Sequence, residues 1–250
     1  MSDHLHPEGD KIAKIIASHG LCSRREAERW IDAGRITYLG TPLLDCAQRI
    51  KDVESIRVDG KPLPTKPKLS LWLYYKPKGV ITSHKDPQGR PTLFDQVRHL
   101  GDHVISVGRL DYNSEGLIVL TNQGPMARLL ELPATGIKRT YRVRVFGVLS
   151  PDDIAAIKDG VLIDGVQYQG ADVVVEREEK SYQWLRMTLI EGKNREIRRL
   201  IEHFGGQVTR LIRTHYGPFS LGTLEPDQCV AVDPAFVERL CRELHADELL

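Results

Sequence analysis

The amino-acid sequence predicts an α+β protein that is divided into two domains. Two expected helices followed by short strands occupy residues 9–60, a pattern typical of a small α/β domain. Residues 61–68 hold three prolines and no apolar period, which indicates a semi-rigid linker. Residues 69–250 are rich in strand patterns with fewer helical ones, which predicts a larger sheet domain flanked by helices. The polar residues 1–8 are expected to form a flexible N-terminus.

Two helices and two strands are expected in the first domain. Isoleucines at helical spacing predict the first helix over residues 11–18. Ser23 and Glu26 form the capping-box pattern that begins a second helix near Arg24. The expected strands cover residues 36–39 and 55–58.

Four arginines form a local basic group on the second expected helix and directly after it: Arg24, Arg25, Arg29 and Arg35. A solvated helix face would also explain them, because the net charge of the chain is only +1. Residues 16–36, which read I-A-S-H-G-L-C-S-R-R-E-A-E-R-W-I-D-A-G-R-I, resemble the S-four-type RNA-binding domain, and the resemblance covers residues 9 to 60. It implies that the four arginines contact RNA phosphates, which gives affinity rather than sequence choice.

Most of the second domain is expected to be strand, with helices between the strands. Apolar and alternating runs predict strands over residues 71–75, 80–83, 104–107, 117–121, 138–146, 161–163, 171–175 and 182–190. Helical spacing and capping patterns predict helices over residues 126–130, from Pro151 to Gly160, from Glu196 to Phe204, and from Pro234 onward.

The segment from Gly108 to Gly124 carries the main candidate site. It reads G-R-L-D-Y-N-S-E-G-L-I-V-L-T-N-Q-G, so that Asp111 lies in a turn before a buried strand. A turn or cap role is the ordinary explanation for one aspartate in such a place. The whole string, however, resembles the catalytic motif of the RsuA/RluB branch of the pseudouridine synthases. The resemblance implies that Asp111 is the essential catalytic residue and that Arg109 fills the space left by a displaced base or holds a phosphate.

Two neighbouring segments resemble further motifs of the same family. Lys76-Pro77-Lys78-Gly79, between two expected strands, resembles its first motif, whose role is structural. In the strand over residues 138–146, Tyr141 alternates with arginines and would ordinarily be a plain aromatic on a sheet face. The resemblance implies instead that Tyr141 stacks on the target base, with Lys138 near the RNA.

A third basic segment, E-G-K-N-R-E-I-R-R-L, runs from Glu191 to Leu200. A solvated basic helix would explain its charges equally well. The segment resembles the family's third motif, in which an arginine pairs with the catalytic aspartate. Alignment within the motif assigns that role to Arg198, with Arg199 as the rival, and we expect the partner to keep Asp111 ionised and oriented. The remaining basic residues are expected to contact RNA: Lys193, Arg195 and Arg199.

No pattern for a metal, nucleotide or membrane site is found in the sequence. The four cysteines, Cys22, Cys46, Cys229 and Cys241, are too far apart for a zinc or redox C-x-x-C motif. Walker A and G-x-G-x-x-G patterns are absent, and no apolar run approaches the roughly 20 residues that cross a bilayer. The start of the chain does not resemble a signal peptide. We therefore expect a cytoplasmic protein without a metal or other cofactor.

Together the resemblances imply a site-specific pseudouridine synthase with a mixed, largely antiparallel β-sheet domain. Such an enzyme isomerises a flipped-out uridine, and an isomerisation requires no redox cofactor. The third motif is closer to the RluB type than to the RsuA type, which favours a uridine in 23S ribosomal RNA, free or in a precursor particle, over 16S ribosomal RNA. A non-catalytic RNA-binding assembly factor is the alternative from another class. We expect a monomer.

Overall fold

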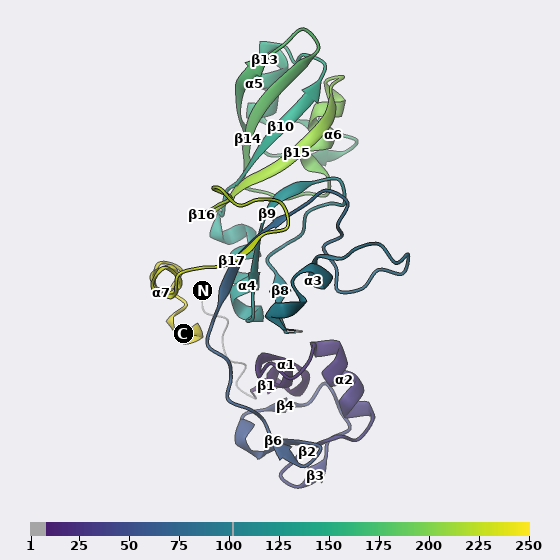
Figure 1. Ribbon diagram of the computed structural model, residues 1–250, viewed down its shortest axis with the longest axis vertical. Coiled ribbons are helices and arrows are strands. Elements are labelled where there is room, and N and C mark those ends of the chain that lie inside the picture. The colour runs from purple at the N-terminus through teal and green to yellow at the C-terminus, as the bar shows by residue number, and fades with distance from the viewer. Residues whose placement is uncertain (1–8, 102) are drawn as a thin grey trace.

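The computed structural model describes residues 9–101 and 103–250 (Figure 1). The expected flexible N-terminus, residues 1–8, lies outside the described residues. Figure 1 shows the N-terminal helices at one end of the molecule and strands β13 and β14 at the other. The α+β prediction is confirmed, since a large mixed sheet carries helices on its faces.

The N-terminal part packs two helices on small sheets. Helices α1 (Ile12–Ser18) and α2 (Arg24–Asp32) cover a sheet in the order β3-β2-β5-β6. Its strands are β2 (Ile36–Tyr38), β3 (Thr41–Pro42), β5 (Ile56–Val58) and β6 (Lys61–Pro62), and β1 (Asp10–Lys11) pairs separately with β4 (Arg49–Ile50). The short helix η1 covers Val53–Ser55. A separate hydrophobic cluster fills this part, built mainly from isoleucines such as Ile12, Ile16, Ile31 and Ile56.

The expected linker starts too early. Lys61 and Pro62 form β6 and pair with Val58 and Arg57. The Asp59-Gly60 turn returns the chain along β5, so these residues complete the small sheet. The chain leaves the N-terminal part only after Pro62.

A nine-stranded sheet dominates the rest of the described chain. Its main order is β13-β14-β10-β15-β9-β7-β17, with β16 on β15 and β8 on β9. The strands are β7 (Leu71–Lys76), β8 (Ile105–Ser106), β9 (Glu115–Thr121), β10 (Arg139–Phe146), β13 (Asp172–Glu178), β14 (Tyr182–Leu189), β15 (Gln207–Tyr216), β16 (Phe219–Ser220) and β17 (Cys229–Ala231). All neighbours pair antiparallel except β9 and β15, which run parallel. A small hairpin, β11 (Leu162–Ile163) and β12 (Val166–Gln167), lies outside this sheet.

Helix α5 begins where its capping residues predict. Ser150 and Asp153 form a reciprocal capping box at the start of α5 (Pro151–Asp159). The other α-helices of this part are α3 (Leu93–Gln96), α4 (Gly124–Glu131), α6 (Glu196–His203) and α7 (Pro234–Glu243). Short 3-10 helices cover Arg98–Leu100 (η2), Pro133–Thr135 (η3) and Asp247–Leu249 (η4).

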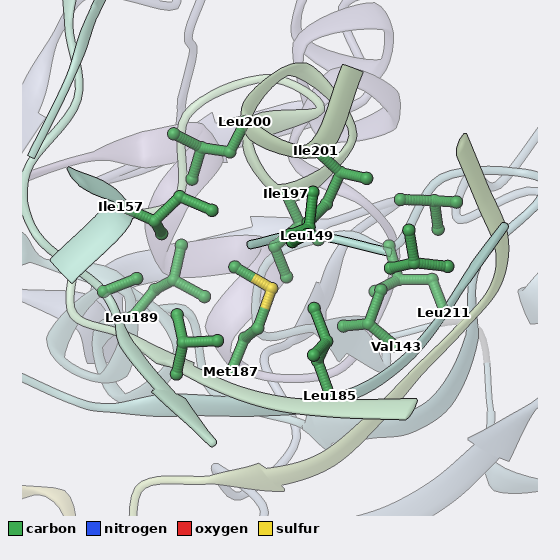
Figure 2. Packing of buried hydrophobic residues seen from close by; sticks show 14 of the residues in the cluster. Val143, Leu149, Ile157, Leu185, Met187, Leu189, Ile197, Leu200, Ile201 and Leu211 are labelled. Carbon is green, nitrogen blue, oxygen red and sulfur yellow. The ribbon is translucent and has the colours of Figure 1, made fainter. Parts of the chain in front are cut away.

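Two hydrophobic layers enclose the central strands. The apolar side of α6, with Ile197, Leu200 and Ile201, packs on the inner residues of β10, β14 and β15 (Figure 2). Strand β9 is buried on both faces: Leu117 and Val119 contact the α4 and α7 side, and Ile118 and Leu120 the α3 side. Burial on both faces explains why β9 reads as an unbroken apolar run.

One expected strand is absent, and one long strand of the structure was not predicted. Residues 80–83 form no strand, and only one isolated bridge joins Ile81 to Thr92. The turn at Gly79, where φ is +84°, directs Val80 into the core instead of along a neighbouring strand. No strand was predicted for residues 207–216, which form β15, because their mixture of polar and apolar residues has no clear period. Strand β15 is nevertheless the strand that joins the two halves of the sheet.

Candidate active site

Backbone contacts fix the turn that carries Asp111. The buried Thr82 hydroxyl accepts a hydrogen bond from the Leu110 amide at 3.3 Å and donates to the Leu110 carbonyl at 2.9 Å. The Gly79 amide donates to the Tyr112 carbonyl at 2.9 Å. The residues on both sides of Asp111 are therefore held, and the carboxylate is presented from a fixed backbone.

Three cations hold the segment that follows Asp111. Lys76 Nζ donates to the Ser114 carbonyl at 2.8 Å, and Arg213 Nε donates to the Leu117 carbonyl at 2.7 Å. Arg198 Nη2 donates to the Asn113 carbonyl at 3.1 Å. The side chains come from β7, β15 and α6, so three separate elements converge on one loop.

These three cations are buried: the exposed fractions are 0% for Lys76, 2% for Arg213 and 9% for Arg198. None forms an ion pair with a residue that the structure describes. Burial lowers the pKa of Lys76 to about 8, while the charges of Asp111 and Glu115 act in the opposite direction. Burial also lowers the pKa of Arg198, and the Asp111 charge again opposes this. The loop beside Asp111 is thus strongly cationic.

The carboxylate of Asp111 has no hydrogen-bond or ion-pair partner among the described residues. Glu115, the next acid along the chain, is engaged: Arg210 Nε donates to it at 2.7 Å and the Tyr75 hydroxyl at 3.2 Å. Asp111 is therefore the carboxylate that stays available for chemistry in this segment.

A cleft of about 300 Å³ opens above Asp111. Arg109, Tyr141 and Arg213 line it together with Asp111. Tyr141 contacts the hydrophobic clusters under α6 and under α3, which orients its ring toward the cleft. The sequence-predicted residues Asp111, Tyr141 and Arg109 therefore line the same cleft.

The expected pairing of Arg198 with Asp111 is not seen as a direct contact between these described residues. Arg198 directs its Nη atoms to the carbonyls of Val208 and Asn113, both at 3.1 Å. Arg199 is exposed, and its Nη1 atom lies 3.5 Å from the Tyr168 hydroxyl. Of the two rivals, Arg198 is the one buried beside the Asp111 loop; its catalytic role stays a prediction.

The loop before α6 forms one wall of the cleft. Lys193 and Arg195 line it, and Arg195 adopts the left-handed backbone conformation with a φ of +52°. Lys193 forms an ion pair with Glu191 through its side chain, and its amide donates to Glu196 at 2.9 Å. Burial and the neighbouring Glu191 carboxyl raise the pKa of Glu196. The exposed Lys138 is not among the residues that line the cleft.

The N-terminal arginines are exposed but mostly engaged. Arg24 lies 3.8 Å from a carboxylate oxygen of Glu28, and Arg29 pairs with Glu26. Arg35 donates to both carboxylate oxygens of Asp59, at 2.9 and 2.5 Å, and stacks over a tryptophan ring. Arg25 has no ion pair with any residue in the described ranges. RNA phosphates would have to replace acidic partners at three of the four predicted positions.

Sequence reasoning missed two residues that the structure places at the site. Lys76 lies in the K-P-x-G segment, which was interpreted only as a structural turn. Arg213 was one of several basic residues in the C-terminal part, and no element was assigned to it. A lysine directly after a strand of aromatic and apolar residues was the available signal for Lys76.

A mixed sheet thus presents an aspartate-bearing loop at a cleft lined by several basic side chains, an arrangement that suits an enzyme with an anionic substrate. Residues 70–203 match the family described as RNA pseudouridylate synthase. The chain therefore belongs to the RNA pseudouridine synthase family.

Relatives of known sequence extend over nearly the whole chain. A protein of Rickettsia prowazekii named an uncharacterized RNA pseudouridine synthase is 42% identical over 232 residues, which cover 92% of this chain and 97% of the relative. The ribosomal large subunit pseudouridine synthase B of Yersinia pestis is 40% identical over 227 residues, which cover 85% of this chain and 69% of that protein. A crystal structure of a pseudouridylate synthase superimposes with a TM-score of 0.66 at 22% identity, covering 92% of this chain and 98% of that one, which shows a shared fold.

The residues that the structure describes hold neither a metal-binding cluster nor a helix that could span a membrane. No cluster of three or more histidine, cysteine or acidic side chains suitable for a metal occurs among them. None of the helices in residues 9–101 and 103–250 combines the length and apolar character needed to cross a membrane.

Proposed function

We propose that this enzyme converts one specific uridine of 23S ribosomal RNA to pseudouridine. The observation that carries the proposal is the Asp111 carboxylate, which is fixed by its backbone, lines the cleft and has no partner among the described residues. The relatives named ribosomal large subunit pseudouridine synthase B support the choice of RNA. A cytoplasmic location and a monomeric state belong to the same proposal.

The reaction breaks the bond between C1′ of the ribose and N1 of the base, turns the base, and joins C5 to C1′. The Asp111 carboxylate acts near C1′, either as the nucleophile or as the base that removes the 2′ proton. Both roles need an ionised carboxylate close to a sugar that has left the RNA stack.

The other cleft residues have separate roles in this proposal. Tyr141 stacks on the flipped base, a contact worth about 1–3 kcal/mol. Arg109 is exposed at the cleft and occupies the space that the base leaves, or holds a phosphate. Arg198 keeps the Asp111 loop in place and adds positive charge near the carboxylate.

Residues 9–60 hold the RNA in a way that is independent of the target sequence. The exposed arginines of this part contact phosphates, while the cleft selects the uridine. The substrate is free ribosomal RNA or a precursor particle; the chemistry is compatible with either.

Primer extension after carbodiimide treatment tests the function. Ribosomal RNA from cells without this protein is compared with RNA from cells rescued by the wild type or by Asp111→Ala. A stop in 23S RNA that returns only with the wild type is the expected result. A stop restored by both versions would move the catalytic role away from Asp111.

The same experiment separates the alternatives. A stop that changes in 16S RNA would replace the proposed substrate. Unchanged stops in both RNAs, together with a defect in ribosome assembly, would favour the non-catalytic assembly factor.

A further inference from the structure

Arg213 carries a buried charge for which the protein supplies no acid. Its Nε atom donates to the Leu117 carbonyl, but its Nη2 atom is buried without a hydrogen-bond partner in the part of the chain that the structure describes. The residue is 2% exposed and lines the cleft beside Asp111. A buried guanidinium with an unused donor is costly to maintain, so its position calls for an anion that arrives with the substrate.

The neighbouring charges do not supply that anion. Lys76 and Arg198 are also buried cations without ion pairs among the described residues. Glu115 is engaged by Arg210 and Tyr75. Within the described segment 111–117, Asp111 is the one carboxylate without a partner against these three positive charges, so this segment carries an excess of positive charge.

The isomerisation itself produces an anion at this place, an argument that rests on the proposed function. Whether Asp111 attacks C1′ or removes the 2′ proton, the electron pair of the C1′–N1 bond moves to the base and leaves a uracil anion. The base then turns and C5 bonds to C1′, while the Asp111–C1′ bond breaks or the 2′ proton returns to the sugar from Asp111. The C5 proton is then lost, and N1 takes up a proton. Substrate and product are isomers, so no oxidant or reductant takes part.

We propose that Arg213 stabilises the uracil anion while the base is detached from the sugar. A fixed positive charge in a cleft shielded from water is most effective where negative charge develops during the reaction. Arg213 does this from a rigid strand, and its Leu117 contact holds the guanidinium in place. Lys76 and Arg198 add to the same field from the other side of the loop.

The test compares two leaving groups. Fluorine at C5 withdraws electrons and makes the detached base a more stable anion, which then depends less on a protein cation. RNA fragments that carry the target nucleotide as uridine or as 5-fluorouridine are reacted in single turnover with the wild type, Arg213→Gln and Arg213→Lys. Conversion is measured for both substrates as loss of the starting nucleotide, by chromatography after nuclease digestion, because fluorine at C5 leaves no proton for the last step and 5-fluorouridine cannot become pseudouridine. The control is Arg144→Gln on the adjacent strand β10, a half-buried arginine that stacks over Tyr182 and is not among the residues that line the cleft.

We expect Arg213→Gln to slow conversion of uridine about 10²-fold and conversion of 5-fluorouridine by a clearly smaller factor. Arg213→Lys keeps the charge and should keep the wild-type ratio of the two rates, as should the control. If the conversion rate fell by the same factor for both bases, Arg213 would have only a structural role. If the Arg213→Gln variant bound RNA more weakly but converted uridine at an unchanged rate, Arg213 would be a phosphate contact.

A variant that does not fold and a wild type without activity lead to different conclusions. If Arg213→Gln does not fold, the lysine variant decides: a folded Arg213→Lys protein with an altered ratio of rates overturns the proposal. A wild-type enzyme that converts no ribosomal uridine would instead remove the proposed function, and with it this inference.

Discussion

Gly116 of β9 and Arg213 of β15 lie opposite each other where these two strands pair in parallel. A Cβ atom on Gly116 would lie 2.4 Å from the Arg213 carbonyl oxygen and 2.7 Å from its amide nitrogen. Gly116 also has a φ of +108°, a conformation that L side chains rarely adopt. The absence of a side chain at Gly116 is therefore what allows Arg213 to approach the Asp111 segment.

The first prediction concerns this contact. Gly116→Ala should lower the free energy of unfolding by at least about 2 kcal/mol, because backbone strain and overpacking each cost on the order of 1–3 kcal/mol. Urea unfolding measures the change. Gly124→Ala is the control, since a Cβ at Gly124 would contact nothing within 4 Å. Similar stability of the two variants would contradict the prediction.

The second prediction separates Arg198 from Arg199. Arg198→Met removes a buried cation and leaves the carbonyls of Asn113 and Val208 without their donor. It should abolish most of the turnover at saturating RNA while RNA binding persists. Arg199→Met, on the exposed side of α6, should act on binding rather than on the maximal rate. Near-normal turnover of the Arg198 variant would remove Arg198 from the mechanism.

The third prediction concerns the pH dependence of stability. Burial and Glu191 raise the pKa of Glu196 in the folded protein, so the folded state keeps a proton that the unfolded chain loses near pH 4.5. The stability linked to this proton is complete below that pH and is lost as the pH rises through the folded-state pKa. Relative to the wild type, Glu196→Gln should therefore gain stability as the pH rises from 4.5. If the free energies of unfolding of the two proteins changed by the same amount across this pH range, the prediction would be wrong.

The fourth prediction tests the N-terminal arginines. Arg25 has no ion pair with another described residue, whereas Arg29 is paired with Glu26. If Arg25 contacts a phosphate, Arg25→Gln should weaken RNA binding and reduce the slope of log K against log salt by about 0.7–0.9. Filter binding over a range of salt concentrations measures this slope. An unchanged slope would place the RNA elsewhere on this part of the protein.

Local sequence patterns were sufficient for several parts of this protein. The capping residues located the start of α5, the apolar run located β9, and the alternation in β10 placed Val143 and Val145 inside and Arg142 outside. Asp111 and Tyr141 were both found from motifs, and the structure brings them to one cleft. Each of these features depends on residues that are close together in the chain, so the sequence displays it directly.

The surroundings of Asp111 depended on the tertiary structure. The parallel pairing of β15 with β9 brings Arg213 to a loop that lies about a hundred residues earlier in the chain, and β7 brings Lys76 to the same loop. Long-range strand pairing decides which cation is buried and which carbonyl it contacts. The local hydrophobic pattern of the sequence does not contain this information. The sequence by itself therefore pointed to Asp111 as the candidate carboxylate, and only the folded sheet decided which cations surround it.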